Sequence, residues 1–307
     1  MDWFSGLLNA MPGAIAQGMI WGIMAIGVYI TYRILDLADL TVDGSICTGM
    51  AVCAVLMTNG VNVWVAMLVS VIAGMLCGFV TGIFHTFMGI PAILAGILTQ
   101  LMLWSVNLKI LGGKANQALP ARNYDVIVTM LRREKAILVA AVICIVLIGL
   151  LYWFFGTKFG CALRATGCNP KMSRAQGINT SMNKVLGLTI SNGIVALAGS
   201  MLAQYSGAAD INNGRGAIVI GLAAVIIGNA IVSKLSENFI VRLIGVVIGG
   251  VIYYLVYTFV IYLGLDTDLL KMLSALVVAV FLAVPHMRKT YFSNRKVQKK
   301  AGGEHHA

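Results

Sequence analysis

The sequence predicts an all-α, polytopic integral membrane protein with about 8 to 10 transmembrane helices, and three observations carry this prediction. The mean hydropathy is +0.90 and charged residues make up 11% of the chain, whereas about a quarter of the residues in soluble domains are charged. Apolar runs long enough to cross about 30 Å of hydrocarbon recur along the sequence. With 34 glycines in 307 residues, this composition excludes an ordinary soluble domain.

Charge and cysteine usage exclude other classes of protein. The net charge of +11 lies mostly in loops and in the C-terminal tail, so it indicates membrane topology, and no nucleic-acid partner is expected. The six cysteines form no CxxC pair and no histidine stands at metal-ligand spacing, so neither a disulfide nor a metal site is predicted. The N-terminus lacks a basic region and a cleavage site, which predicts that it is retained.

Nine apolar segments are expected to cross or enter the membrane, within a permease domain spanning residues 1–285 and followed by a basic tail, 286–307. In chain order the segments are 12–32, 40–57, 63–84, 90–111, 136–155, 185–205, 217–232, 239–263 and 269–284. The segment 217–232 is too short for a standard span, so a short or bent crossing is expected there.

Closely spaced glycines predict tight contacts between neighbouring helices. Trp3, Phe4 and Trp21 are expected to anchor the first segment at a membrane interface. The glycines expected to pack against other helices are Gly18, Gly22 and Gly27 in the first segment, Gly74, Gly78 and Gly82 in the third, and Gly245 and Gly249 in the eighth.

Two polar breaks stand directly before apolar runs. RILDLADLTVDGS, residues 33–45, opens the second segment, and GAADINNGRG, residues 207–216, opens the seventh. Polar breaks at comparable positions of two halves are typical of internally duplicated transporters. The breaks therefore predict a lining of the solute path, although an ordinary acidic loop with helix-capping residues remains an alternative. The candidate path residues, which include polar groups at membrane depth, are Asp39, Thr41, Asp43, Ser45, Thr99, Asn107, Asn192 and Asn213.

The polar interval 158–184 carries five basic residues and no acid. Asn169 suits a helix N-cap, Pro170 suits the first helical position and Gly177 suits a left-handed end, so a two-turn helix is predicted over 170–176. A connection of this length indicates a docking surface. The alternative is a basic loop that follows the positive-inside rule.

The basic tail and the basic interval are expected on the cytoplasmic side. Alternation of spans then puts residues 210–215, residues 112–135 and the N-terminus on the other side. Within 112–135 a small amphipathic segment is expected over 124–131. His85 is expected to be an interfacial residue.

Sequence signatures of enzymes are absent: there is no GxSxG, HExxH or P-loop motif. Energy for uphill transport must therefore come from elsewhere. Three hypotheses remain open on the residues alone: a subunit driven by a separate ATPase, an ion-coupled secondary transporter, and a channel-like structural subunit.

The run LRATGCNPKMSRAQGIN, residues 163–179, resembles the cytoplasmic coupling loop of bacterial ABC-importer permeases of the branched-chain amino acid and ribose group. LDLADLTVDGS, residues 35–45, is similar to the signature that opens the second helix in these permeases. PAILAGILT and NLKILGGKAN, residues 91–99 and 107–116, resemble the subgroup paired with binding proteins for tryptophan or tyrosine. The resemblance covers nearly the whole chain.

The resemblance implies a homodimeric permease in the bacterial cell membrane. Its partners would be two ATPase subunits and an external or periplasmic solute-binding protein. ATP and Mg²⁺ would bind the ATPases, so this chain would hold no cofactor and catalyse no reaction. Cys168 and Met172 depart from the family pattern. The residues implied in coupling are Arg164, Ala165, Gly167, Asn169, Pro170, Lys171, Arg174, Gly177 and Asn179.

Overall fold

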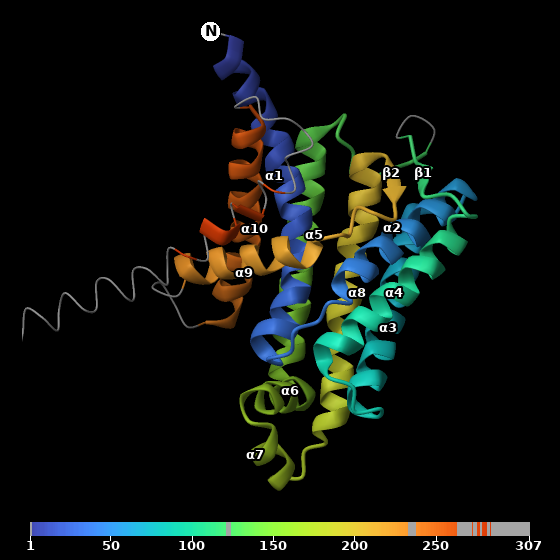
Figure 1. The fold of residues 1–307 in the computed structure, drawn as a ribbon. Helices are drawn as coiled ribbons and strands as arrows, with labels where there is room; N and C mark the ends of the chain where they lie inside the picture. Colours follow the sequence, from blue (N-terminus) through green and yellow to red (C-terminus); the bar gives the residue numbers. More distant parts are fainter. Residues whose placement is uncertain are drawn as a thin grey trace, which may run out of the picture.

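The computed structural model describes residues 2–120, 124–232 and 238–262, with 272, 275–276, 278–280 and 283. These residues form a helical bundle with one short two-stranded ribbon (Figure 1). The expected segment 269–284 falls largely, and the tail 286–307 entirely, outside the described residues. The elements are α1 (Asp2–Tyr29), the π-helix η1 (Ile30–Ile34), α2 (Val42–Thr58), α3 (Val63–Thr86), α4 (Ala92–Ile110), β1 (Asn116–Ala118), α5 (Arg133–Gly156), α6 (Lys158–Cys168), α7 (Pro170–Ala175), α8 (Thr180–Ser206), β2 (Ala208–Asp210), α9 (Ala217–Val232) and α10 (Phe239–Tyr262).

Among the described residues, six helices are long and apolar enough to cross a membrane, and α2 and α9 are shorter apolar helices. The predicted all-α, multi-pass fold is confirmed, and the predicted bounds of α9 agree with the structure. The first span was predicted to begin at Pro12, but α1 continues through that proline. Membrane helices tolerate a proline because neighbouring groups satisfy the freed backbone carbonyl.

Two local structures were not foreseen in detail. The interval 158–184 contains a helix that was not expected, α6, ahead of the predicted one. The segment 124–131, expected to be amphipathic, has an irregular backbone. The side-chain oxygen of Gln204 on α8 accepts the Ile127 N–H at 3.1 Å, and Val128 is buried. A tertiary contact therefore fixes this segment in an irregular conformation.

The bundle consists of two similar halves. In the first, α1 is followed by a polar break, the short helix α2 and the long helix α3; in the second, α8, α9 and α10 repeat this order. Helix α1 packs along α10, and α8 packs along α3. Figure 1 shows that α1 and α8 run in opposite directions through the bundle. Such an inverted arrangement is found in many transporters.

The ribbon and the α6–α7 region lie at opposite ends of the bundle (Figure 1). Strand β1 pairs antiparallel with β2, with Asn116 opposite Asp210. This pairing puts the segments before α5 and before α9 at the same end, as the alternation of spans predicted. The N-terminus of α1 lies at that end too.

Glycines allow neighbouring helices of the bundle to approach closely, including helices of different halves. A Cβ on Gly78 of α3 would meet the Leu188 carbonyl oxygen of α8, and one on Gly82 would lie 2.9 Å from the Val185 Cα. Gly74 faces α8 in the same stripe. The other predicted packing glycines also face partner helices: Gly18 and Gly22 face α10, Gly27 faces α8, and Gly245 and Gly249 face α9.

Replacing Gly78 with leucine is expected to prevent stable packing of α3 on α8. Overpacking of a well-packed interior costs about 1–3 kcal/mol or more, and here the added atoms would meet backbone. Gly149→Leu on α5 is the matched control, because nothing lies within 4 Å of a Cβ there. The fraction of monodisperse protein after detergent extraction measures the effect. Equal recovery of both variants would contradict the packing role.

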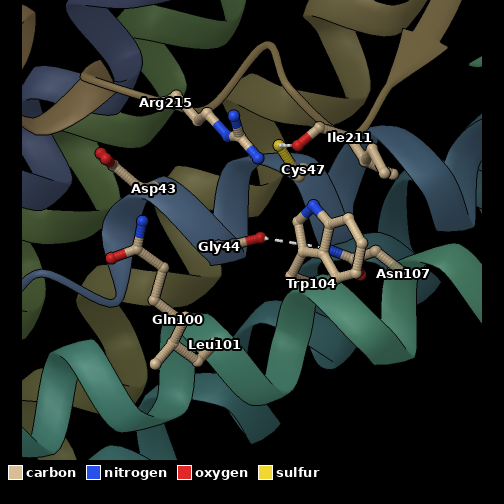
Figure 2. A pocket seen from close by; sticks show the side chains of 9 residues that line it. All are labelled: Asp43, Gly44, Cys47, Gln100, Leu101, Trp104, Asn107, Ile211 and Arg215. Atoms are coloured by element: carbon tan, nitrogen blue, oxygen red, sulfur yellow. Dashed lines mark hydrogen bonds between the residues drawn. The ribbon is translucent and has the colours of Figure 1, made fainter. Parts of the chain in front are cut away.

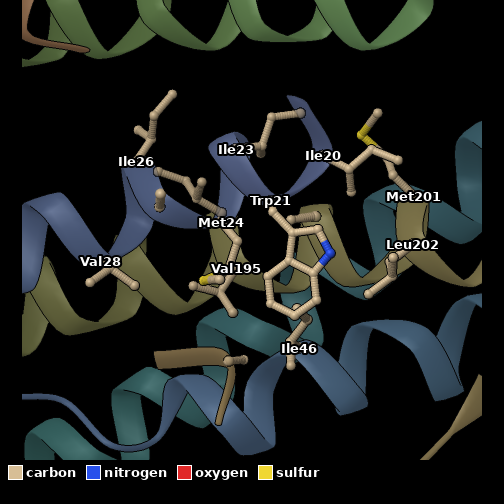
Figure 3. Packing of buried hydrophobic residues seen from close by; sticks show 14 of the residues in the cluster. Ile20, Trp21, Ile23, Met24, Ile26, Val28, Ile46, Val195, Met201 and Leu202 are labelled. Atoms are coloured by element: carbon tan, nitrogen blue, oxygen red, sulfur yellow. The ribbon is translucent and has the colours of Figure 1, made fainter. Parts of the chain in front are cut away.

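The core lies where α1 crosses α8 and α2. Figure 3 shows Ile20, Trp21 and Met24 of α1 facing Val195 and Leu202 of α8, with Ile46 of α2 beneath them. Trp21 is 6% exposed and stacks on Tyr254 with ring centroids 5.8 Å apart. The expectation that Trp21 anchors the chain at an interface is therefore wrong. The side chains of Trp3 and Phe4 lie outside the described part of the structure.

Candidate functional site

The first candidate site is the coupling segment, residues 158–179, which comprises α6, α7 and the turn into α8. The Asn169 side chain accepts the Met172 N–H at 3.1 Å, Pro170 begins α7, and Gly177 has φ +78°. The predicted two-turn helix is thereby confirmed, with its end at Ala175 instead of Gln176. Figure 1 shows α7 projecting beyond the bundle.

Some residues of the coupling segment face the bundle and others face outward. The Arg164 guanidinium lies 4.5 Å from the Phe239 ring centroid and 5.1 Å from that of Phe155. Gly167 lies directly against the Ile34 carbonyl oxygen of η1. Both residues, which the resemblance implied in coupling, therefore hold α6 against α5, α10 and η1, and Ala165 beside them is half-buried.

The outward part of the coupling segment is polar. Pro170, Lys171 and Arg174 are exposed, and the Arg174 Nε donates to the Thr180 hydroxyl at 2.7 Å. The Asn179 side chain caps α8 by accepting the Met182 N–H at 3.1 Å. Helix α7 is thus tied to the first turn of α8 on one side and to α6 on the other. His85 also lies near this end, where its Nδ1 contacts the Ile90 carbonyl oxygen at 2.9 Å.

The first polar break forms a buried hydrogen-bond network. The Asp39 carboxylate accepts the Thr41 N–H at 2.9 Å and the Asn192 side-chain N–H at 2.7 Å. The Asn192 carbonyl oxygen in turn accepts the Ser45 hydroxyl at 2.6 Å. These bonds join the start of α2 to α8.

The same network extends to α3 and α4. The hydroxyls of Thr41 and Thr81 are 2.7 Å apart, and Thr81 donates to Thr99 at 2.9 Å. Asp39, Thr41, Ser45, Thr99 and Asn192 are all 3% exposed or less, and none lines a cavity described here. The structure thus places five of the eight predicted path residues in the packed interior of this chain, where hydrogen bonds link them into one network.

The second candidate site is the helix junction, where α2 and α9 begin beside each other. The Asp43 carboxylate, in the first turn of α2, accepts the backbone N–H groups of Gly216 and Ile218 at 2.9 and 2.8 Å. It therefore caps the start of α9 from another helix, where the helix dipole favours a negative charge. The Cys47 sulfur also accepts the Gly214 N–H at 3.1 Å.

Two cavities flank the junction. One, of about 190 Å³, lies between α2 and α4, and Figure 2 shows Asp43, Trp104, Asn107 and Arg215 around it. There the Asn107 side-chain N–H donates to the Gly44 carbonyl oxygen at 3.4 Å.

The other cavity, of about 370 Å³, lies between α1, α9 and α10. It is lined by Asn213 and by Arg215, which borders both cavities. Asp43, Asn107 and Asn213 are therefore the predicted path residues that line these cavities, although Asn107 itself is only 1% exposed. Arg215 was not predicted as a path residue. Its position as a cation within the second polar break could have indicated it.

Comparison with known proteins identifies the family to which this architecture belongs. The family described as the permease component of branched-chain amino acid transport systems matches residues 11–284. The chain belongs to this family. It is 38% identical over 287 residues to a tyrosine transport system permease protein of Clostridioides difficile, with 92% of each chain covered.

Two more distant proteins are also similar. The autoinducer 2 import system permease protein LsrC of Salmonella typhimurium is 29% identical over 216 residues, which cover 69% of this chain and 59% of that protein. Among solved structures, PsaBC from Streptococcus pneumoniae in complex with Fab matches with a TM-score of 0.52 at 13% identity, covering 92% and 94% of the two chains. That likeness concerns the fold alone. The predicted membership of the permease family is thus confirmed.

Proposed function

We propose that this chain is the membrane-spanning subunit of an ATP-driven importer in the bacterial cell membrane, and that its solute is a small molecule, an amino acid and preferably an aromatic one. The observation that carries the proposal is the coupling segment, a capped and outward-facing helix at one end of a bundle of apolar spans. Membership of the permease family and similarity to a protein named for tyrosine transport support it.

The proposed assembly contains two copies of this permease, two ATPase subunits and an external solute-binding protein. ATP and Mg²⁺ bind the ATPases. The coupling segment and the C-terminal tail face the cytoplasm, because both are rich in lysine and arginine. The ribbon, at the other end of the bundle, then faces the binding protein.

Closure of the ATPases on ATP moves α7, and the contacts of the coupling segment carry that movement into the spans. Arg164 and Gly167 hold α6 against α5, α10 and η1. The Arg174 contact with Thr180 joins α7 to α8. A push on α7 therefore acts on both halves of the bundle, and the solute path opens alternately to each side.

The test is uptake into proteoliposomes that contain this permease with its ATPase. The binding protein is added outside the vesicles, and ATP is enclosed inside them. Radiolabelled L-tyrosine should accumulate only with ATP and an intact ATPase. Accumulation driven by a proton or sodium gradient in vesicles without the ATPase would overturn the proposal in favour of an ion-coupled secondary transporter.

A further inference from the structure

The cavity between α1, α9 and α10 has walls of unusual composition for a membrane helix bundle. Its volume of about 370 Å³ falls within the roughly 300–1,000 Å³ of small-molecule sites. Trp21 of α1 and Tyr253, Tyr254 and Tyr257 of α10 supply aromatic rings, and Asn213 and Arg215 supply polar groups. The aromatic and polar groups come from different elements.

The aromatic rings form one contiguous group. Tyr254 lies 5.8 Å from Trp21 and 5.8 Å from Tyr257, measured between ring centroids, and Tyr253 lies 5.6 Å from Tyr254. Tyr253 and Tyr254 are 1% and 5% exposed, whereas Tyr257 is half-buried. Mutual packing therefore holds the rings in place, and Tyr257 is the most exposed of the three tyrosines. Such a wall favours a planar ring, which can stack or meet an edge.

The polar end of the cavity is positively charged. Arg215 is exposed, and the described residues supply no carboxylate within ion-pairing distance of it. Asp43, the nearby acid in Figure 2, directs both carboxylate oxygens to the N–H groups of Gly216 and Ile218. Within the described ranges no acid engages the arginine, and a guanidinium matches a carboxylate in geometry and charge.

The equivalent corner of the first half is filled by hydrogen-bonded side chains. There the polar break before α2, the first turn of α2, and helices α3 and α8 meet through Asp39, Ser45, Thr81 and Asn192, which are hydrogen-bonded and buried. In the second half the corresponding elements enclose the aromatic cavity. At equivalent positions, hydrogen-bonded side chains fill the first half, whereas the second half encloses a cavity. The two halves of the bundle therefore differ here.

Building on the proposed function, we propose that this cavity is a binding site for an aromatic L-amino acid within the permease itself. The ring of the ligand packs against Tyr254, Tyr257 and Trp21, and its α-carboxylate pairs with Arg215. The permease then selects its solute in addition to the external binding protein.

Direct binding to the purified full-length permease in lipid nanodiscs tests the site without ATPase or binding protein. Calorimetric titrations should show that L-tyrosine binds at least tenfold more tightly than tyramine, which lacks the carboxylate, and at least tenfold more tightly than L-leucine, which lacks the ring. These comparisons use the unaltered chain, so they do not depend on the folding of any variant.

Two variants assign the contacts. Arg215→Gln should weaken L-tyrosine binding at least tenfold and leave tyramine binding unchanged, whereas Tyr257→Leu should reduce the preference for L-tyrosine over L-leucine. Arg132→Gln, at an exposed position before α5, is the control and should bind like the unaltered chain. No measurable L-tyrosine binding, or equal binding of L-tyrosine and tyramine, would overturn the site.

The failure of this inference is distinguishable from failure of the proposed function. If ATP-driven uptake is intact but the permease alone does not distinguish the three compounds, the site is refuted and the importer stands. If the permease binds L-tyrosine as expected but uptake needs no ATPase, the site stands and the importer is refuted.

Discussion

Replacing Asp43 with alanine is expected to abolish ATP-driven uptake while the chain still inserts into the membrane. The carboxylate makes two hydrogen bonds to the start of α9, and bonds to a charged group contribute about 1.5–3 kcal/mol each. Without them, Gly216 and Ile218 lose their partner and the helix junction separates. Uptake of L-tyrosine into proteoliposomes and the thermal stability of the purified permease measure the effect.

Asp43→Asn keeps a side-chain acceptor and should fall between alanine and the native residue in both measurements. Asp125→Ala is the control, because Asp125 is exposed in the loop before α5. Native uptake and native stability in Asp43→Ala would show that the junction is dispensable. Asp43 would then be an ordinary capping residue, the alternative that the sequence left open.

Gly177→Pro is expected to uncouple ATP hydrolysis from transport and to lower uptake at least tenfold. Gly177 has φ +78°, and its N–H is donated to the Arg174 carbonyl oxygen; proline fixes φ near −65° and has no N–H. The turn that ends α7 must therefore change, and α7 leaves its position. ATPase activity and uptake measured on the same proteoliposomes give the coupling ratio.

Gly60→Pro provides a matched control at the other end of the bundle. Gly60 has φ +81° and donates its N–H to the Met57 carbonyl oxygen, so the local damage is alike. Both variants should lose stability, but only the one at Gly177 should lose coupling. Lys171→Glu adds a milder change, because Lys171 is exposed on α7. A native coupling ratio in Gly177→Pro and Lys171→Glu together would rule out the coupling segment as the contact with the ATPase.

Local patterns were enough to predict several elements. Asn169, Pro170 and Gly177 define α7 because capping and left-handed turns depend on a few adjacent residues. The glycines of α3 likewise indicate a packing face, although the sequence does not name the partner helix. These predictions succeeded where the controlling interactions are close in sequence.

The interior of the helix junction was not predictable in the same way. Asp39 bonds to Asn192, 153 residues away, and Asp43 bonds to Gly216 and Ile218, 173 and 175 residues away. A single sequence marks these groups as polar at membrane depth but does not pair them. The hydrogen-bond partner decides whether a polar side chain faces a solute or is buried against another side chain. More path residues were therefore predicted than the structure places beside a cavity.

The aromatic cavity was missed because its rings were read one at a time. Trp21 was predicted to anchor the chain at a membrane interface, and the tyrosines of the segment 239–263 were not singled out. Tyr253, Tyr254 and Tyr257 lie within two turns of one helix, and three phenol groups in a membrane segment need partners. The spacing of these tyrosines indicates an aromatic cluster on one helix. Only the fold shows that Trp21 and Arg215 line the same cavity.

The two-stranded ribbon connects one end of the bundle directly to the helix junction. Strand β2 ends at Asp210, and the chain from there reaches Arg215 and the cap of α9 without an intervening helix. Because β1 is hydrogen-bonded to β2, a protein that grips this surface and shifts the ribbon also displaces Arg215. In the proposed importer, docking of the solute-binding protein on the ribbon and displacement of Arg215 are therefore a single movement.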